Sequence, residues 1–171
     1  QTLDNWLNGG GKLIVLGDAN AQFAKNENYA LSMKTTDSEE KEDELSPSDI
    51  EPYAKATAVD SSRHNPGSVI RTRIDDTHPL AYGMGENYFS LTTSSQAYKL
   101  SDKLWNIAYT QEDFSHYGYM GSEIKENLEG SLIIGVEDKG EGHVIYFHDD
   151  PLFRGFWKSG KQLMGNALFN F

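Results

Sequence analysis

Cysteine does not occur anywhere in the 171 residues of this chain. Without it, the chain can form no disulfide, no thiolate nucleophile and no cysteine-ligated zinc site. Thiol catalysis is therefore excluded. Because disulfides are the usual sign of an oxidising compartment, the cysteine content does not reveal where the protein works.

Long apolar stretches and basic clusters are also missing. The longest apolar run, Leu13 to Leu16, has the length of a strand, whereas a membrane-spanning helix needs about 20 apolar residues. The 15 lysines and arginines are outnumbered by 26 aspartates and glutamates, which gives a net charge of −11. We therefore expect no membrane span, and no nucleic acid as a partner, because nucleic acids are bound through basic surfaces.

The negative charge is concentrated in the segment 35–52. It holds eight acidic side chains and one lysine, a local charge of −7 that leaves −4 for the rest of the chain. With few apolar side chains, such a segment cannot bury enough surface to offset the entropy lost on ordering. We predict that residues 1–171 form a single domain with a mobile acidic insertion at 35–52.

The first elements follow from the apolar pattern. Hydrophobic residues make up 37% of the chain and aromatic residues 12%, as in globular domains. Residues 2–8 are predicted to form a short helix, which three glycines at 9–11 end. Residues 12–17 form a strand apolar on both faces, typical of a central parallel strand between helices. Asp18 or Asn20 is expected to cap the helix that follows.

Further strands are predicted at 68–75, 87–91, 103–110, 131–137 and 143–148. In the first of these, apolar and charged residues alternate, which indicates a half-exposed strand near a sheet edge. The short glycine-containing connection between the last two predicts an antiparallel hairpin. Residues 76–85 should form a turn and one helical turn that starts at Pro79, and residues 121–128 a loop or a helical turn.

The last thirty residues carry the strongest pattern. A buried strand at 144–147 is followed by a turn at 149–151 and by a helix whose apolar residues recur at near-helical intervals: Phe153, Phe156, Trp157, Leu163, Met164, Ala167 and Leu168. This is the strand-to-helix unit of an α/β sandwich. We predict the α/β class: a flavodoxin-like three-layer sandwich with a mostly parallel sheet and an antiparallel hairpin near the C-terminus.

Four blocks of sequence span most of the chain outside the acidic segment. They are a helix, Gly-Gly and strand at 3–16, Asp-x-x-His-Pro-Leu with a later glycine at 75–83, Gly-Glu-Gly-His-Val-Ile-Tyr-Phe at 140–147, and Pro-Leu-Phe-Arg-Gly-Phe-Trp with Asn-Ala-Leu-Phe at 151–169. Together they resemble the amidotransferase-like C-terminal accessory domain of bacterial zinc carboxypeptidases of the carboxypeptidase-A-like family.

The resemblance implies a noncatalytic accessory domain that packs on or positions the peptidase domain of the same parent chain. The parent would remove C-terminal residues from peptides with zinc-activated water, so the zinc would lie in the peptidase domain and no cofactor is expected here. Such enzymes are exported, which implies a periplasmic or extracellular location. Strand-helix units precede Leu3 in the family. We therefore expect a truncated fold whose unpaired sheet edge could promote self-association.

No catalytic signature is present in the residues themselves. An amidotransferase would need the missing cysteine, and no Gly-x-Ser-x-Gly serine elbow occurs, since Gly121-Ser122 lacks the second glycine. None of the five histidines, His64, His78, His116, His143 and His148, is followed three positions later by the glutamate of the parent family's zinc site. We assign no catalytic, cofactor-binding or metal residue to this chain.

Two acidic clusters allow more than one interpretation. His148, Asp149 and Asp150 could contribute to a hard-cation site, but carboxylates after a strand more often cap the next helix. The cluster at 75–79 could be catalytic through His78. Asp76 or Thr77 as the N-cap ahead of Pro79 explains the same cluster without chemistry.

Aromatic residues support an alternative function, a carbohydrate- or surface-binding module of a glycosidase-like protein. The candidates for stacking against sugar rings are Tyr82, Tyr88, Phe89, Tyr98, Trp105, Tyr109, Phe114, Tyr117 and Tyr119. Aromatic residues of strands commonly fill a core instead. Residues 116–120 form the most loop-like cluster and the one we expect to be exposed.

Overall fold

The computed structural model describes residues 2–34, 52–155 and 157–171. The predicted acidic insertion lies outside the described residues except for its last position, and so does Phe156. No helix among the described residues is long and apolar enough to cross a membrane.

The described residues form one seven-stranded sheet whose main path runs β1-β7-β6-β4-β2-β3, with β5 paired to β2. The strands are β1 (Lys12–Leu16), β2 (Ser68–Ile74), β3 (Asn87–Thr92), β4 (Trp105–Tyr109), β5 (His116–Tyr117), β6 (Leu132–Lys139) and β7 (Gly142–Phe147). Only the β1–β7 pair among these is parallel.

The prediction of a mostly parallel sheet is therefore wrong, whereas the antiparallel hairpin β6–β7 is confirmed. The prediction rested on the continuous apolar pattern of β1. That pattern reports that both faces of a strand are covered, and it does not report the direction of the neighbouring strand. The observed fold is a mixed α/β fold with a mostly antiparallel sheet.

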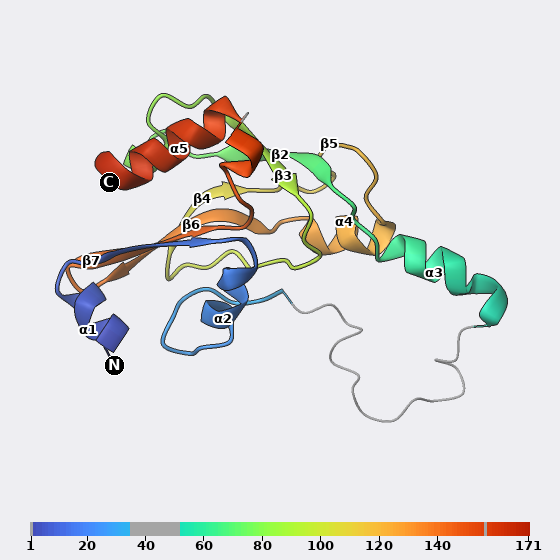
Figure 1. Ribbon diagram of the computed structural model, residues 1–171, viewed down its shortest axis with the longest axis horizontal. Helices are drawn as coiled ribbons and strands as arrows, with labels where there is room; N and C mark the ends of the chain where they lie inside the picture. The colour runs from blue at the N-terminus through green and yellow to red at the C-terminus, as the bar shows by residue number, and fades with distance from the viewer. Residues whose placement is uncertain (1, 35–51, 156) are drawn as a thin grey trace.

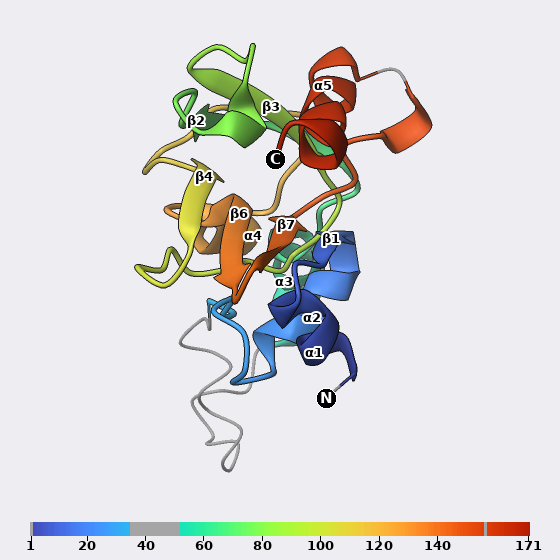
Figure 2. The same cartoon turned by 90° about the vertical axis from the view of Figure 1, so that its left-hand side faces the viewer.

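Helices lie on both faces of the sheet. They are α1 (Thr2–Asn8), α2 (Asn20–Ala24), α3 (Ala56–Ser62), α4 (Ser122–Leu128) and α5 (Lys158–Phe169), with the 3₁₀ turns η1 (Gly17–Ala19), η3 (Tyr53–Lys55), η4 (Pro79–Ala81) and η5 (Phe153–Gly155). Figure 1 shows α5 on one side of the sheet, α1 and α2 on the other and α3 projecting from one end of it, and Figure 2 shows the same layers from the side.

The two faces carry two separate apolar cores. Along β7, Ile145 and Phe147 belong to the core beneath α5, whereas Val144 and Tyr146 belong to the core beneath α1 and α2. This alternation is the two-residue period of a strand. Burial on both faces explains why the predicted strand at 143–148 is an almost unbroken apolar run.

The last helix begins later than predicted. It starts at Lys158, after the separate 3₁₀ turn η5, in which Arg154 has a φ of 50° and so breaks helical continuity. Leu163 and Ala167 are fully buried against the sheet, four residues apart on one helical face. Leu168, predicted to be part of that face, is exposed because it lies on the adjoining side of the helix.

The predicted strand near a sheet edge is confirmed. Ile70, Thr72 and Ile74 of β2 are buried, and β2 lies one strand in from the terminal strand β3. Residues 121–128, predicted as a loop or a helical turn, form the two-turn helix α4, which buries Ile124 and Leu128. Residues 116–120, predicted as a loop, begin with the short strand β5.

Candidate functional site

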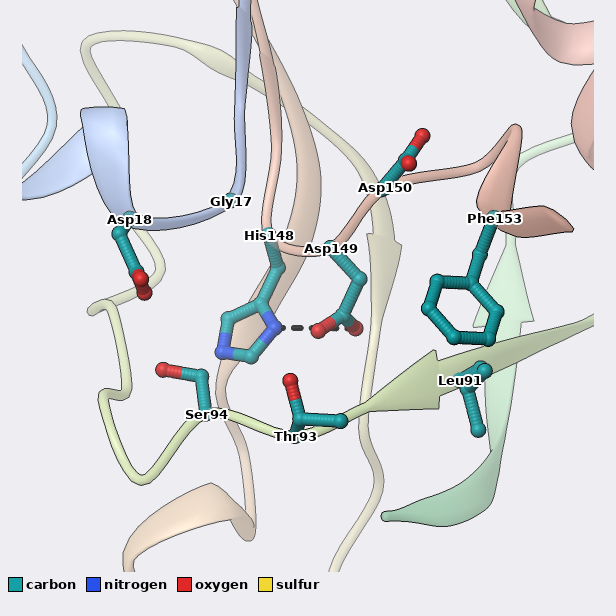
Figure 3. A pocket seen from close by; sticks show the side chains of 9 residues that line it. All are labelled: Gly17, Asp18, Leu91, Thr93, Ser94, His148, Asp149, Asp150 and Phe153. Carbon is teal, nitrogen blue, oxygen red and sulfur yellow. Dashed lines mark ion pairs between the residues drawn. The ribbon is translucent and has the colours of Figure 1, made fainter.

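A small crevice opens at the carboxyl ends of β1 and β7. Because these two strands are parallel, their carboxyl ends meet at one edge of the sheet, the position where open α/β sheets bind ligands. The cavity has a volume of about 140 Å³ and is shown in Figure 3. Its lining residues are Gly17, Asp18, Leu91, Thr93, Ser94, His148, Asp149, Asp150 and Phe153.

His148 is the central side chain of this crevice and is almost fully buried. Its Nε2 lies 2.8 Å from the Gln96 carbonyl oxygen, so Nε2 carries the proton of that hydrogen bond. Its Nδ1 lies 3.0 Å from Oδ2 of Asp149, in an ion pair rather than a well-aligned hydrogen bond. The Ser90 hydroxyl donates to the same Oδ2 over 2.7 Å. The cluster joins β3, the 93–98 segment and the end of β7.

The surroundings of His148 favour its charged form. Burial alone lowers the pKa of the imidazole, because a charge loses its hydration. The nearby Asp149 carboxylate and the Gln96 carbonyl outweigh burial, so the pKa of His148 is raised above its ordinary value. A protonated imidazole whose two nitrogens both face acceptors has no lone pair for a proton or a metal. In this arrangement both ring nitrogens of His148 face acceptors of the protein itself.

Two further polar residues of the crevice, Ser94 and Asp150, are engaged in local structure. The Gln96 backbone N–H donates to the Ser94 hydroxyl oxygen over 3.1 Å. The Leu152 N–H donates to Oδ1 of Asp150 over 2.8 Å, and the Asp150 carboxylate points away from the imidazole in Figure 3. This bond caps the turn that leads into η5, which is the role that the capping interpretation predicts for Asp150.

The hard-cation interpretation finds no support in this geometry. Within residues 2–34, 52–155 and 157–171, no three histidine, aspartate or glutamate side chains are grouped so that they could hold a metal ion. His143 and His148 lie at opposite ends of β7. The Asp149 carboxylate serves His148 and Ser90 instead of a shared cation.

Residues 75–79 form a hydrogen-bonded turn that leads into the 3₁₀ turn η4, and the residue that caps η4 differs from the prediction. Nδ1 of His78 accepts a hydrogen bond from the Leu80 N–H over 3.1 Å, so His78, and not Asp76 or Thr77, caps the 3₁₀ turn η4. Asp75 instead accepts bonds from both the N–H and the hydroxyl of Thr77. Burial lowers the pKa of His78, so its neutral, hydrogen-bond-accepting form is favoured.

The nine aromatic candidates divide into a buried group, an exposed group and Tyr109, which is half-buried. Tyr88, Tyr98 and Phe114 are core residues, as the packing interpretation predicts. The exposed members are Tyr82, Phe89, Trp105, Tyr117 and Tyr119. The exposed rings therefore include both tyrosines of the predicted 116–120 cluster and Trp105, which the sequence indicates only as one of several strand aromatics.

No protein-family model matches the chain, and no curated protein matches it. A cytoplasmic protein from Salmonella typhimurium superposes with a TM-score of 0.47 at 11% identity, over 98% of this chain and 57% of that one. A structure from Bacteroides uniformis described as ThuA-like superposes with a TM-score of 0.46 at 12% identity, over 97% and 60%.

ThuA-like proteins belong to the class I glutamine amidotransferase-like fold, and neither description mentions a carboxypeptidase. Both TM-scores lie below 0.5, so neither likeness implies a function for this chain. The chain spans less than two thirds of the length of each of these structures.

Proposed function

We propose that this chain is a noncatalytic accessory domain of a secreted zinc carboxypeptidase-like protein, where it packs on or positions the peptidase domain. The observation that supports the proposal most is the state of the crevice at the carboxyl ends of β1 and β7. There the chain has no cysteine, and His148 is held on both ring nitrogens by groups of the protein itself. Because the histidine of this crevice is held by internal contacts, the domain acts by contacting the peptidase domain through its surface.

The blocks that resemble the accessory domain have packing roles, which fits a structural function. A Cβ atom at Gly142 would lie 2.2 Å from the Gly11 carbonyl oxygen, so only glycine allows the chain to pass there. In the last block, the Asn166 amide donates to the carbonyl oxygens of Leu80 and Tyr82 over 2.9 Å each, which ties α5 to η4. The second and fourth blocks therefore hold each other in place.

The coding sequence on either side of this chain provides the first test. The proposal expects a peptidase domain with His-x-x-Glu and a distant histidine in the same reading frame, preceded by an export signal. A glycosidase barrel in that position, or no peptidase, would overturn it.

The second test is reconstitution. The peptidase domain is produced with and without this domain attached, and peptide hydrolysis and thermal unfolding are measured. We expect the attached domain to raise the unfolding temperature of the peptidase domain. The zinc should be found in the peptidase domain only. Equal unfolding temperatures and no association of the separate domains in sedimentation would contradict the accessory role.

A carbohydrate- or surface-binding module is the second candidate function. The observation that favours it is the exposed ring of Trp105, 57% of whose surface is in contact with solvent. This candidate is compatible with either parent enzyme, because a binding module can accompany a peptidase as well as a glycosidase.

A further inference from the structure

Trp105 presents its ring at the end of the sheet opposite the His148 crevice. It is the first residue of β4, opposite Val136 of β6, and 57% of its surface is exposed. Its indole N–H donates to Oδ2 of Asp138 over 3.3 Å. The polar edge of the indole is therefore satisfied within the protein, while much of the apolar ring stays in contact with water.

Three further aromatic rings, those of His78, Phe171 and His143, lie near the Trp105 ring or next to one another. The ring centres of His78 and Trp105 lie 6.2 Å apart, and the Phe171 ring lies 4.8 Å from both His78 and His143. Nδ1 of His143 donates to Oδ1 of Asp138 over 2.8 Å, because a carboxylate only accepts. We refer to Trp105, His78, Asp138, His143 and Phe171 as the Trp105 surface. It joins β4, β6, β7, η4 and the end of the chain.

Two shallow depressions adjoin the Trp105 surface. One, of about 360 Å³, includes Trp105 and Asp138 and is otherwise lined by Ser101, Asp102, Lys103, Leu104 and Asn106. The other, of about 450 Å³, includes His78 and is otherwise lined by Asp76, Thr77, Pro79, Tyr82 and Asn170. Together the two depressions present hydroxyl, amide, carboxylate and ammonium groups beside an aromatic platform, so donors as well as acceptors are available to a ligand.

The charges of this region indicate which classes of ligand it can bind. The depressions contain three carboxylates, Asp76, Asp102 and Asp138, against the single ammonium of Lys103. This excess of negative charge disfavours phosphates and other anions. Both carboxylate oxygens of Asp138 already accept hydrogen bonds, from Trp105 and His143. This carboxylate is therefore already engaged within the protein and does not favour a cationic ligand.

We propose that the Trp105 surface binds a neutral polysaccharide, with one sugar ring stacked on the indole and hydroxyl groups of the flanking sugars bonded in the two depressions. This inference rests on the second candidate function and names its site and ligand class. The C–H face of a pyranose ring is apolar and packs on an indole ring, while its hydroxyls both donate and accept. A neutral chain also incurs no repulsion from the three carboxylates.

In the test, the intact chain is titrated with four neutral hexasaccharides: cellohexaose, maltohexaose, mannohexaose and hexa-N-acetylchitohexaose. Binding is measured by calorimetry and by tryptophan fluorescence. Trp105→Ala removes the platform and is expected to weaken binding of the preferred sugar at least tenfold. Trp105→Phe keeps a ring and should weaken it less. Tyr117→Ala is the matched control, because Tyr117 is also an exposed aromatic residue of a strand but lies outside the Trp105 surface.

Unchanged unfolding temperatures for the Trp105 variants, measured in parallel, would assign the loss to the binding site rather than to folding. The proposal is overturned if no hexasaccharide binds, if Tyr117→Ala weakens binding as much as Trp105→Ala, or if poly-lysine binds instead with strong salt dependence. A failure here leaves the accessory role intact, since that role is judged by the neighbouring coding sequence and by reconstitution.

Discussion

His148 and Asp149 are adjacent in sequence and form a buried ion pair, with 3.0 Å between Nδ1 and Oδ2 and side chains that are 1% and 8% exposed. Neighbours along a strand normally project to opposite faces, but this pair follows the last residue of β7, where the strand has ended. The chain can therefore turn both side chains toward one crevice. The pair is best explained as the connection that closes the carboxyl edge of the sheet.

Stability should depend on pH through this pair. The pKa of His148 is raised in the folded state, so the pair's contribution is complete below the ordinary histidine pKa of about 6.5. It is lost as the pH rises through the raised folded-state pKa. Urea midpoints measured from pH 5.5 to pH 9 should fall in that window. In His148→Gln, which keeps a donor for Gln96 but not the charge, this fall should disappear.

His78 contributes with the opposite sign. Its folded-state pKa is lowered, so its contribution is present above about pH 6.5 and is lost as the pH falls through the lowered value. His78→Asn keeps a cap acceptor that does not titrate. Titrating this variant beside His148→Gln separates the two effects. A fall above pH 6.5 that persists in His148→Gln would contradict the assignment to His148.

Removing one member of the buried pair should cost more than removing its accessory donor. Asp149→Asn leaves the His148 charge without its partner, which typically costs about 3–5 kcal/mol. Ser90→Ala removes one hydrogen bond to the same carboxylate, typically worth about 1 kcal/mol. Equilibrium unfolding in urea at pH 6 measures both. Equal losses for the two variants would show that the carboxylate does not stabilise the imidazolium.

The purified chain should show no amidase, esterase or peptidase activity and should bind no stoichiometric zinc. The reasons are the missing cysteine and the missing His-x-x-Glu pair. Chromogenic substrates and elemental analysis provide the measurements. One tightly held zinc per chain, or a turnover that His148→Gln abolishes, would overturn this expectation.

Local elements followed from the sequence far better than long-range ones. The β6–β7 hairpin was predictable because a short glycine-containing turn fixes the pairing of its two flanking strands. The direction of β1 relative to the rest of the sheet was not, since apolarity reports coverage alone. The cap of η4 was misassigned by one or two residues because histidine is an uncommon N-cap, although His78 stands next to Pro79.

In the candidate site, too, the local features were predictable from the sequence and the long-range contacts were not. His148 and Asp149 were visible as polar residues at the end of an apolar strand. Their partners Ser90 and Gln96 are 59 and 52 residues away, and no local pattern connects them. Trp105 was predicted only as one of many strand aromatics. Its exposure follows from its position at the start of β4, which alternation of apolar residues within a strand does not reveal.

The last prediction concerns the glycine at the start of β7. A Cβ at Gly142 would lie 2.2 Å from the Gly11 carbonyl oxygen and 2.3 Å from that of Leu7, both backbone atoms that cannot move without shifting α1 or β1. Gly142→Ala should therefore destabilise the fold strongly or prevent it. Gly165→Ala is the matched control, because nothing lies within 4 Å of its Cβ and the residue is inside α5. Alanine there should raise the free energy of unfolding by about 0.5–1 kcal/mol. Thermal unfolding of both variants decides the question, and a neutral Gly142→Ala would show that the junction of α1, β1 and β7 is looser than described.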